Sequence, residues 1–187
     1  MSGLQFVKGL ASGALPLNTI AQTLGYDVVE AESGRVAITL DPTGAHLNPW
    51  GTVHGGLTAV LLDSCMGLAI QSMLERGVGS TTLEFKISLV RAITLETGQI
   101  RAEGRVLNCG RRVGTAEGRV TDTMGQLLAH GTTTCLIFRA NVCCTRYRAR
   151  AALRTSRTPH GRPALRLRAG TRSKCRVSTW PSRPAAV

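Results

Sequence analysis

The sequence lacks the features that mark several specialised classes of protein. None of its six cysteines is spaced as C-x-x-C, so neither a zinc site nor any other metal site is expected. Six scattered cysteines are also too few to form the disulfide scaffold of a 187-residue chain. The first fourteen residues contain no continuous apolar run behind a basic start. We therefore expect no secretory signal and a reducing, cytoplasmic setting.

Acidic residues are absent from the last 47 residues, which hold 12 of the 23 basic residues. Residues 1–140 contain 11 basic and 11 acidic residues, and their net charge is zero. The chain therefore consists of a neutral body followed by a cationic tail, residues 141–187. A body of this length is long enough to bury one core. The hydrophobic share of 43% excludes wholesale disorder.

The Arg-rich tail has two possible interpretations. Its other residues are mostly Ala, Pro, Ser, Thr and Gly without apolar periodicity, so it is not expected to fold alone. It could be an arm for nucleic acid or another acidic surface, but only Tyr147 and Trp180 supply aromatic side chains for such binding. GC-rich DNA read out of frame encodes a similar composition. We favour this accidental extension over a nucleic-acid partner.

The body predicts two short strands, one long helix and four further strands. Residues 55–74 are long enough to span a membrane, but Asp63 and Gln71 fall within them, so a buried helix is expected instead. The short connections between the later strands favour antiparallel neighbours. We predict an α+β fold in which a curved antiparallel sheet wraps around the helix. The expected strands are 26–30, 35–40, 81–90, 99–107, 112–122 and 127–138, and the helix runs from residue 54 to a stop at 77–79.

The segment before and within this helix carries the candidate chemistry. Gly55 and Gly56 let a ligand approach the backbone, and they open a helix whose first amides lack internal partners. Such amides can stabilise a carbonyl oxygen that becomes negative in a transition state. Asn48 and His54 can add polar contacts, and Asp63 is a carboxylate in an otherwise apolar helix. Each feature alone has a structural explanation, but their combination favours a catalytic site.

The run Asn48-x-x-Gly51-x-x-His54-Gly55-Gly56, with Asp63 seven residues further on, resembles the signature of hotdog-fold acyl-CoA thioesterases of the phenylacetic-acid-degradation (PaaI-like) type. The resemblance covers roughly residues 15–138. It implies that Asp63 is the nucleophile or general base and that the Gly55 amide polarises the thioester carbonyl. It also implies that Asn48 and His54 support that end of the site and that Thr82 helps to hold water. No cofactor is implied.

Helix geometry adds a constraint on this site. Gly55 and Asp63 are eight residues apart, which corresponds to about 12 Å of helix rise. A carbonyl held at Gly55 therefore cannot also meet Asp63 of the same chain. A two-fold dimer with antiparallel helices would bring the two groups together. The resemblance likewise implies a homodimer or homotetramer with sites at the subunit interface.

Other residues and other functions remain candidates. Arg111, Arg112 and Arg91 can bind the phosphates of CoA, although exposed arginines commonly serve solubility alone. Gly56 is a backbone contact for substrate, whereas Cys65 and His130 are expected to be structural. A hotdog enoyl-CoA hydratase or dehydratase would use the same fold, and a non-catalytic acyl-CoA-binding or basic-tailed interaction protein is a further alternative. The sequence does not specify the acyl group.

Overall fold

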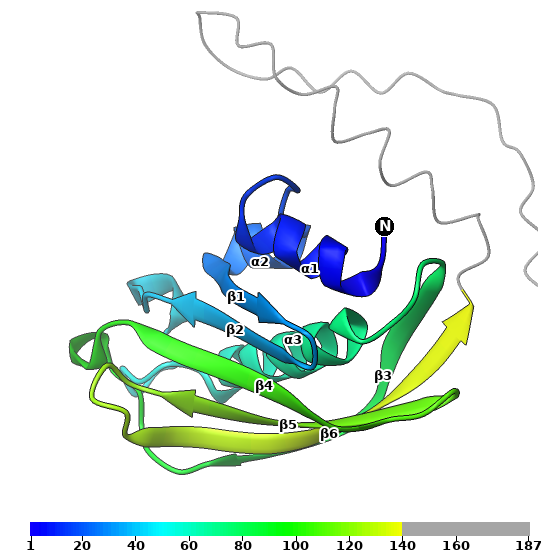
Figure 1. Cartoon of the computed structure of the whole chain (residues 1–187). Coiled ribbons are helices and arrows are strands. Elements are labelled where there is room, and N and C mark those ends of the chain that lie inside the picture. Colours follow the sequence, from blue (N-terminus) through cyan, green and yellow to red (C-terminus); the bar gives the residue numbers. More distant parts are fainter. Residues whose placement is uncertain (140–187) are drawn as a thin grey trace, which may run out of the picture. The chain divides into compact units, whose positions relative to one another are not determined.

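A six-stranded antiparallel sheet curves around one long helix in the computed structural model, which describes residues 1–139 (Figure 1). This arrangement confirms the predicted α+β hotdog fold. The predicted tail, with its alternatives of an acidic-surface arm or an accidental extension, lies outside the described residues. The elements are α1 (Gly3–Ala11), α2 (Thr19–Leu24), β1 (Tyr26–Glu32), β2 (Arg35–Leu40), α3 (Gly55–Ser72), β3 (Val78–Leu89), β4 (Ile100–Cys109), β5 (Val113–Thr121) and β6 (Leu127–Arg139), with 3-10 turns at Gly44–His46 and Leu95–Thr97.

The strand order β1-β2-β4-β5-β6-β3 places β3 at one edge of the sheet, beside β6. Between β3 and β4 the chain therefore passes the positions of β6 and β5 to reach the place of β4 beside β2. Short connections between neighbouring strands do not predict this crossover. The long helix ends earlier than expected, because Met73 caps it by donating to carbonyls in its last turn. Gly77, with a φ of 80°, then turns the chain into β3, so residues 78 and 79 are strand rather than helix stop.

Close contact between α3 and the sheet depends on glycine in two strands. A Cβ atom added to Gly104 of β4 would lie 2.4 Å from the carbonyl oxygen of Cys65. One added to Gly118 of β5 would lie 2.9 Å from the Cγ of Met66. These glycines let the sheet lie directly on the helix. A side chain at either position would push the two apart, because closely packed protein interiors tolerate little extra volume. The helix is thereby fixed against the centre of the sheet.

Polar contacts orient α3 about its axis. The hydroxyl of Tyr26, which is buried in β1, forms a 3.0 Å hydrogen bond with the hydroxyl of Ser64. At the C-terminal end of the helix, Ser72 Oγ accepts a 2.8 Å hydrogen bond from the amide of Gly34. This orientation leaves one stripe of α3 only half-buried, and the stripe includes Asp63 and Gly67.

Among residues 1–139, no helix is long and apolar enough to cross a membrane.

An ion-pair network covers the face of β2 and β4 that points away from α3. Arg35 pairs with Glu30 at 2.8 Å and with Glu103 at 2.9 Å. Arg105 pairs with the second oxygen of Glu103 at 2.8 Å. Partial burial acts to raise the pKa of Glu103, but the hydrogen bonds and charges of Arg35 and Arg105 outweigh it and lower that pKa to about 2.

This network predicts acid sensitivity of the fold. Since the pKa of Glu103 is lower in the folded state than its ordinary value of 4.5, the stabilisation is complete above that value and is lost as the pH falls towards 2. The side chain of Glu103 is 22% exposed, so screening is incomplete. We expect the free energy of unfolding to fall by about 1–3 kcal/mol between pH 5 and pH 2 through this group. Urea titrations across this range test it, and the Glu103→Gln variant should lack this component. An identical pH dependence in both proteins would contradict the assignment.

Candidate active site

The start of α3 presents an unpaired backbone amide. His54 is the N-cap residue, and its Nδ1 accepts a 2.9 Å hydrogen bond from the amide of Gly56. Within the described residues, the Gly55 amide donates no hydrogen bond. This amide lies at the positive end of an 18-residue helix. It is therefore a donor available to a ligand, whereas the Gly56 amide is already satisfied by His54.

Asn48 shapes the loop that leads into the helix. Its Oδ1 accepts hydrogen bonds from the amides of Trp50, at 2.9 Å, and Thr52, at 3.3 Å. Its Nδ2 donates to the hydroxyl of Thr52 at 2.8 Å. The side chain thus holds the loop as an Asx-type turn. Gly51 completes the turn with a φ of 78°, a conformation that glycine adopts readily.

Asp63 and Thr82 are in direct contact, although they belong to α3 and β3. The hydroxyl of Thr82 donates a 2.8 Å hydrogen bond to Oδ1 of Asp63. Both side chains are half-buried. The Sγ of Cys135, on the neighbouring strand, lies 3.9 Å from the same hydroxyl. Thr82 therefore holds one carboxylate oxygen of Asp63 in place, and Thr82 itself packs against β6.

A β-bulge in β3 makes this contact possible. Thr82 pairs with Cys135 but Glu84 pairs with Thr134, so Leu83 is the extra residue. Side chains alternate faces along a strand, and a bulge resets that alternation. Thr82 therefore faces α3, and so do Phe85 and Leu89 beyond the bulge. If the alternation of Phe85, Ile87 and Leu89 continued without a bulge, the side chain of Thr82 would point away from α3. The sequence pattern contains no signal for the bulge, so it could not predict that Thr82 faces the helix.

The predicted arginines divide between the two ends of the helix. Arg91 follows β3, and the nearby Ile93 accepts a hydrogen bond from the amide of Val53 in the loop before α3. Arg111 and Arg112 form the β4–β5 turn, next to Gly114, whose added Cβ would meet Ile70 near the end of α3. All three arginines are exposed. Only Arg91 lies near Gly55 of its own chain.

Cys65 and His130, both expected to be structural, are placed differently. Cys65 is fully buried against the sheet, and this burial raises the pKa of its thiol. A neutral, inaccessible thiol is not a nucleophile. His130 is exposed on β6, opposite Ser88 and Arg119 in neighbouring strands. Within residues 1–139, no group of three or more His, Cys, Asp or Glu side chains could hold a metal ion.

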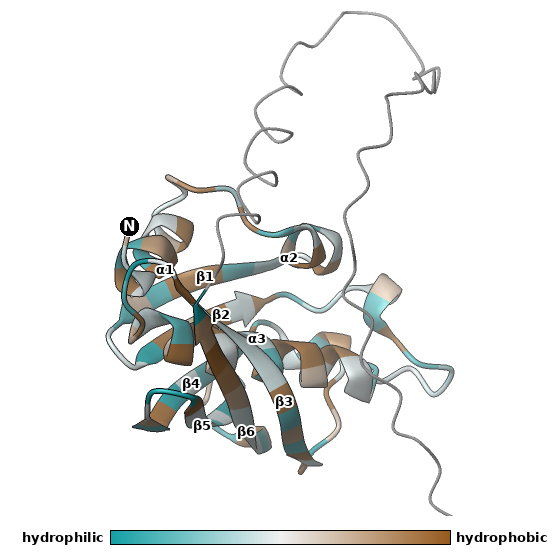
Figure 2. Ribbon diagram, turned by 90° about the vertical axis from the view of Figure 1, so that its right-hand side faces the viewer, coloured by the Kyte–Doolittle hydropathy of each residue, from teal (hydrophilic) through white to brown (hydrophobic). Residues whose placement is uncertain are grey.

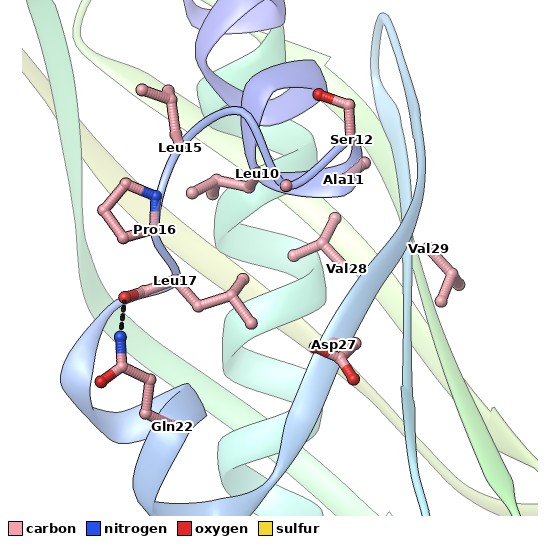
Figure 3. A pocket seen from close by; sticks show the side chains of 11 residues that line it. Leu10, Ala11, Ser12, Leu15, Pro16, Leu17, Gln22, Asp27, Val28 and Val29 are labelled. Carbon is pink, nitrogen blue, oxygen red and sulfur yellow. Dashed lines mark hydrogen bonds between the residues drawn. The ribbon is translucent and has the colours of Figure 1, made fainter. Parts of the chain in front are cut away.

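An open groove of about 650 Å³ lies away from these residues, between the α1–α2 segment and β1 (Figure 3). Leu10, Leu17 and Val28 point into it, and Gln22 donates a hydrogen bond to the Leu17 carbonyl at its rim. No predicted site residue lines this groove. This groove is therefore separate from the candidate site, whose half-buried residues Gly55, Asp63 and Thr82 belong to α3 and β3.

Comparison with known proteins shows the family of this chain. The profile of the thioesterase superfamily matches residues 51–129. A putative esterase of Halobacterium salinarum is 31% identical over 50% of this chain, and the match spans 64% of that protein. Human acyl-coenzyme A thioesterase 13 is 30% identical over 56% of this chain and 74% of its own length. The chain belongs to the thioesterase superfamily.

A solved structure refines this assignment within the superfamily. A putative thioesterase of Ralstonia eutropha, described as phenylacetic acid degradation-related, is 28% identical to this thioesterase. The two superpose with a TM-score of 0.64 over 70% of this chain and 98% of the other. The predicted PaaI-like hotdog family, and with it the class of thioester hydrolases, is confirmed.

The hydrogen bond from the Gly56 amide to His54 predicts an effect on the stability of the fold that can be measured separately from any catalytic activity. His54→Ala removes the acceptor for the Gly56 amide and should lower the free energy of unfolding by about 1 kcal/mol. His54→Asn restores a short acceptor at the cap and should recover most of that loss. Urea denaturation of the two variants and the parent protein measures the difference. Equal stability of the Ala and Asn variants would show that the cap is not important.

Proposed function

We propose that this thioesterase hydrolyses an acyl-CoA to a free carboxylic acid and CoA at sites shared between two subunits. One observation carries the proposal: α3 has an unpaired Gly55 amide at its start and an anchored Asp63 eight residues later. The first group suits a developing oxyanion and the second suits proton transfer or nucleophilic attack. The free thiols of Cys65, Cys109 and Cys135 fit a reducing, cytoplasmic setting.

The Gly55 amide is the electrophilic half of the proposed site. A thioester carbonyl oxygen that accepts from this N–H gains negative charge as the carbon becomes tetrahedral. A preorganised amide at a helix N-terminus stabilises that charge more than it stabilises the neutral carbonyl. His54 and Asn48 act indirectly, because they hold the cap and the loop that aim the amide. Gly56 leaves room for the His54 ring, because a Cβ atom at this position would lie 2.9 Å from Nδ1 of His54.

Asp63 is the acidic half of the proposed site. Thr82 occupies its Oδ1, which leaves Oδ2 free for the reaction. As a general base, Asp63 takes a proton from water while the water oxygen bonds to the thioester carbon. The carbon–sulfur bond then breaks, and the CoA sulfur receives the proton. As a nucleophile, Oδ2 would bond to the carbon directly, and the carbon–sulfur bond would break to release the CoA thiolate. Water would then hydrolyse the resulting anhydride, which frees the acid and Asp63 and supplies the proton that CoA takes up. Both routes need Asp63 beside the thioester carbon, in direct contact for nucleophilic attack and one water molecule away for general-base catalysis.

The two halves require a second copy of the chain. About 12 Å of helix rise separates Gly55 and Asp63 on one uninterrupted helix. A homodimer, alone or within a tetramer, pairs the Gly55 end of one α3 with Asp63 of the partner subunit. The edge strand β3 supports such an assembly, because Leu83 is 59% exposed and Phe85 is 45% exposed. Figure 2 shows bands of hydrophobic residues along β3. Apolar surface of this kind is typical of an interface.

The substrate would lie across this interface. Its acyl group would enter the apolar space beside Leu89, which reaches within 2.8 Å of the position of a Cβ on Gly55. Its nucleotide would stay outside, where Arg91 is available near the same helix start. Arg111 and Arg112 lie towards the other end of α3, so they would serve a site only together with the partner's helix start.

Replacement of Asp63 by Asn should abolish hydrolysis while leaving the fold intact. The amide keeps the shape and can still contact Thr82, but it can neither accept the water proton nor attack. We expect kcat to fall by about a thousandfold with little change in the affinity for a non-hydrolysable CoA ester analogue. Thiol release from a panel of aromatic, short-chain and long-chain CoA esters measures the activity. Asp27→Asn, an exposed carboxylate of β1, is the matched control. Retention of hydrolysis by Asp63→Asn would exclude Asp63 from the mechanism.

A further inference from the structure

Trp50 is 91% exposed, more than any other large hydrophobic side chain among the described residues. A tryptophan has a large apolar surface, and leaving that surface in water is unfavourable. A single exposed hydrophobic residue is common on protein surfaces and by itself indicates no function. Trp50 is different, because the backbone that carries it is held on both sides.

The loop around Trp50 is tightly hydrogen-bonded. The Trp50 amide donates to Oδ1 of Asn48, and the Gly51 amide donates to the Asn48 carbonyl at 3.0 Å. The Asn48 amide donates to the Thr52 carbonyl at 2.8 Å, and Leu47 forms a β-bridge with Val53. Few backbone conformations remain to be lost when something binds to this loop. A preorganised aromatic residue is an effective anchor for a flat apolar group.

The position of the loop indicates which group this is. Trp50 precedes Gly55 by five residues, so even an extended chain keeps it within about 17 Å of the amide that would bind the thioester carbonyl. The hydrogen bond from the Val53 amide to Ile93 holds the segment after Arg91 against the same loop. An aromatic ring and a guanidinium group therefore lie around one helix start. That combination suits a purine with its phosphates.

We propose that Trp50 stacks on the adenine of the CoA ester whose carbonyl is bound at Gly55 of the same chain. This inference rests on the proposed acyl-CoA substrate and names the residue that recognises its nucleotide end. The pantetheine arm carries the adenine away from the reacting carbonyl to the protein surface, where Trp50 lies. The acyl group is accommodated elsewhere, beside Leu89 between the helices. Arg91 contacts the phosphates next to the stacked base.

Fluorescence tests this contact without any chemistry. The sequence has two tryptophans, so Trp180→Phe in the full-length chain leaves Trp50 as the sole tryptophan. Its emission should be quenched by CoA and by adenosine 3′,5′-bisphosphate, but not by pantetheine, which lacks the base. Equal quenching by pantetheine, or no quenching by either nucleotide, would overturn the proposal. Because no turnover is needed, this result is independent of whether the protein hydrolyses thioesters.

Kinetics test the same contact with two substrates that share an acyl group. One is the CoA ester, and the other is the corresponding pantetheine ester, which has no adenine. Trp50→Leu keeps apolar bulk but lacks an aromatic face, and the ratio of kcat/KM for the CoA ester to that for the pantetheine ester should fall by about tenfold or more. Trp50→Phe retains stacking and should keep most of the ratio.

Two kinetic outcomes would contradict the proposal. An unchanged ratio in Trp50→Leu would show that Trp50 does not contact adenine. Dissociation of the oligomer in Trp50→Leu, detected by analytical ultracentrifugation, would assign Trp50 to the contact between subunits instead. If the parent protein hydrolyses neither ester, the proposed function fails, and the fluorescence titration alone decides the role of Trp50.

Discussion

The rigidity of α3 is the constraint on which the proposed chemistry depends. Its 18 residues form one uninterrupted helix, so the distance between the Gly55 amide and Asp63 cannot close by bending. A flexible connection would let one chain bring an amide and a carboxylate to the same carbonyl. Because the helix prevents this, the proposed site requires association with a second copy of the chain. Exposed hydrophobic side chains on β3 and the half-buried face of α3 are consistent with that association.

The rest of the fold holds this helix in place. Gly104 and Gly118 allow the sheet to lie against its backbone, and Tyr26 fixes its rotation next to Asp63 through Ser64. The bulge at Leu83 lets β3 contribute a hydroxyl to Asp63 and apolar side chains near the helix start. One strand thus holds the carboxylate of Asp63 in place and, in the proposed site, also lines the space for the acyl group.

Sequence patterns predicted the fold well because periodicity reports burial directly. The helix, its N-terminus at His54 and most strand positions follow from apolar spacing and turn residues. The pairing of β3 with β6 could not be predicted, since strand order depends on contacts between distant segments. The motif and the resemblance named Asn48, His54, Gly55, Asp63 and Thr82 as site residues, but they did not predict that Thr82 would contact Asp63 directly. That Asn48 and His54 bond to their own loop and cap, rather than pointing outward, depends on side-chain geometry that spacing does not encode.

Mixed dimers provide the most direct test of a site shared between subunits. Gly55→Pro deletes the amide N–H at the first helical position, where proline is tolerated, and His54 already has the extended conformation (φ −61°, ψ 130°) that a following proline requires. Gly55→Pro and Asp63→Asn should each be inactive alone. After the two variants are unfolded and refolded together, half of the dimers are mixed and each contains one intact site, so roughly a quarter of the parent activity should return. A mixture that stays inactive, although the mixed dimers form, would place both groups in one chain's site and contradict the account.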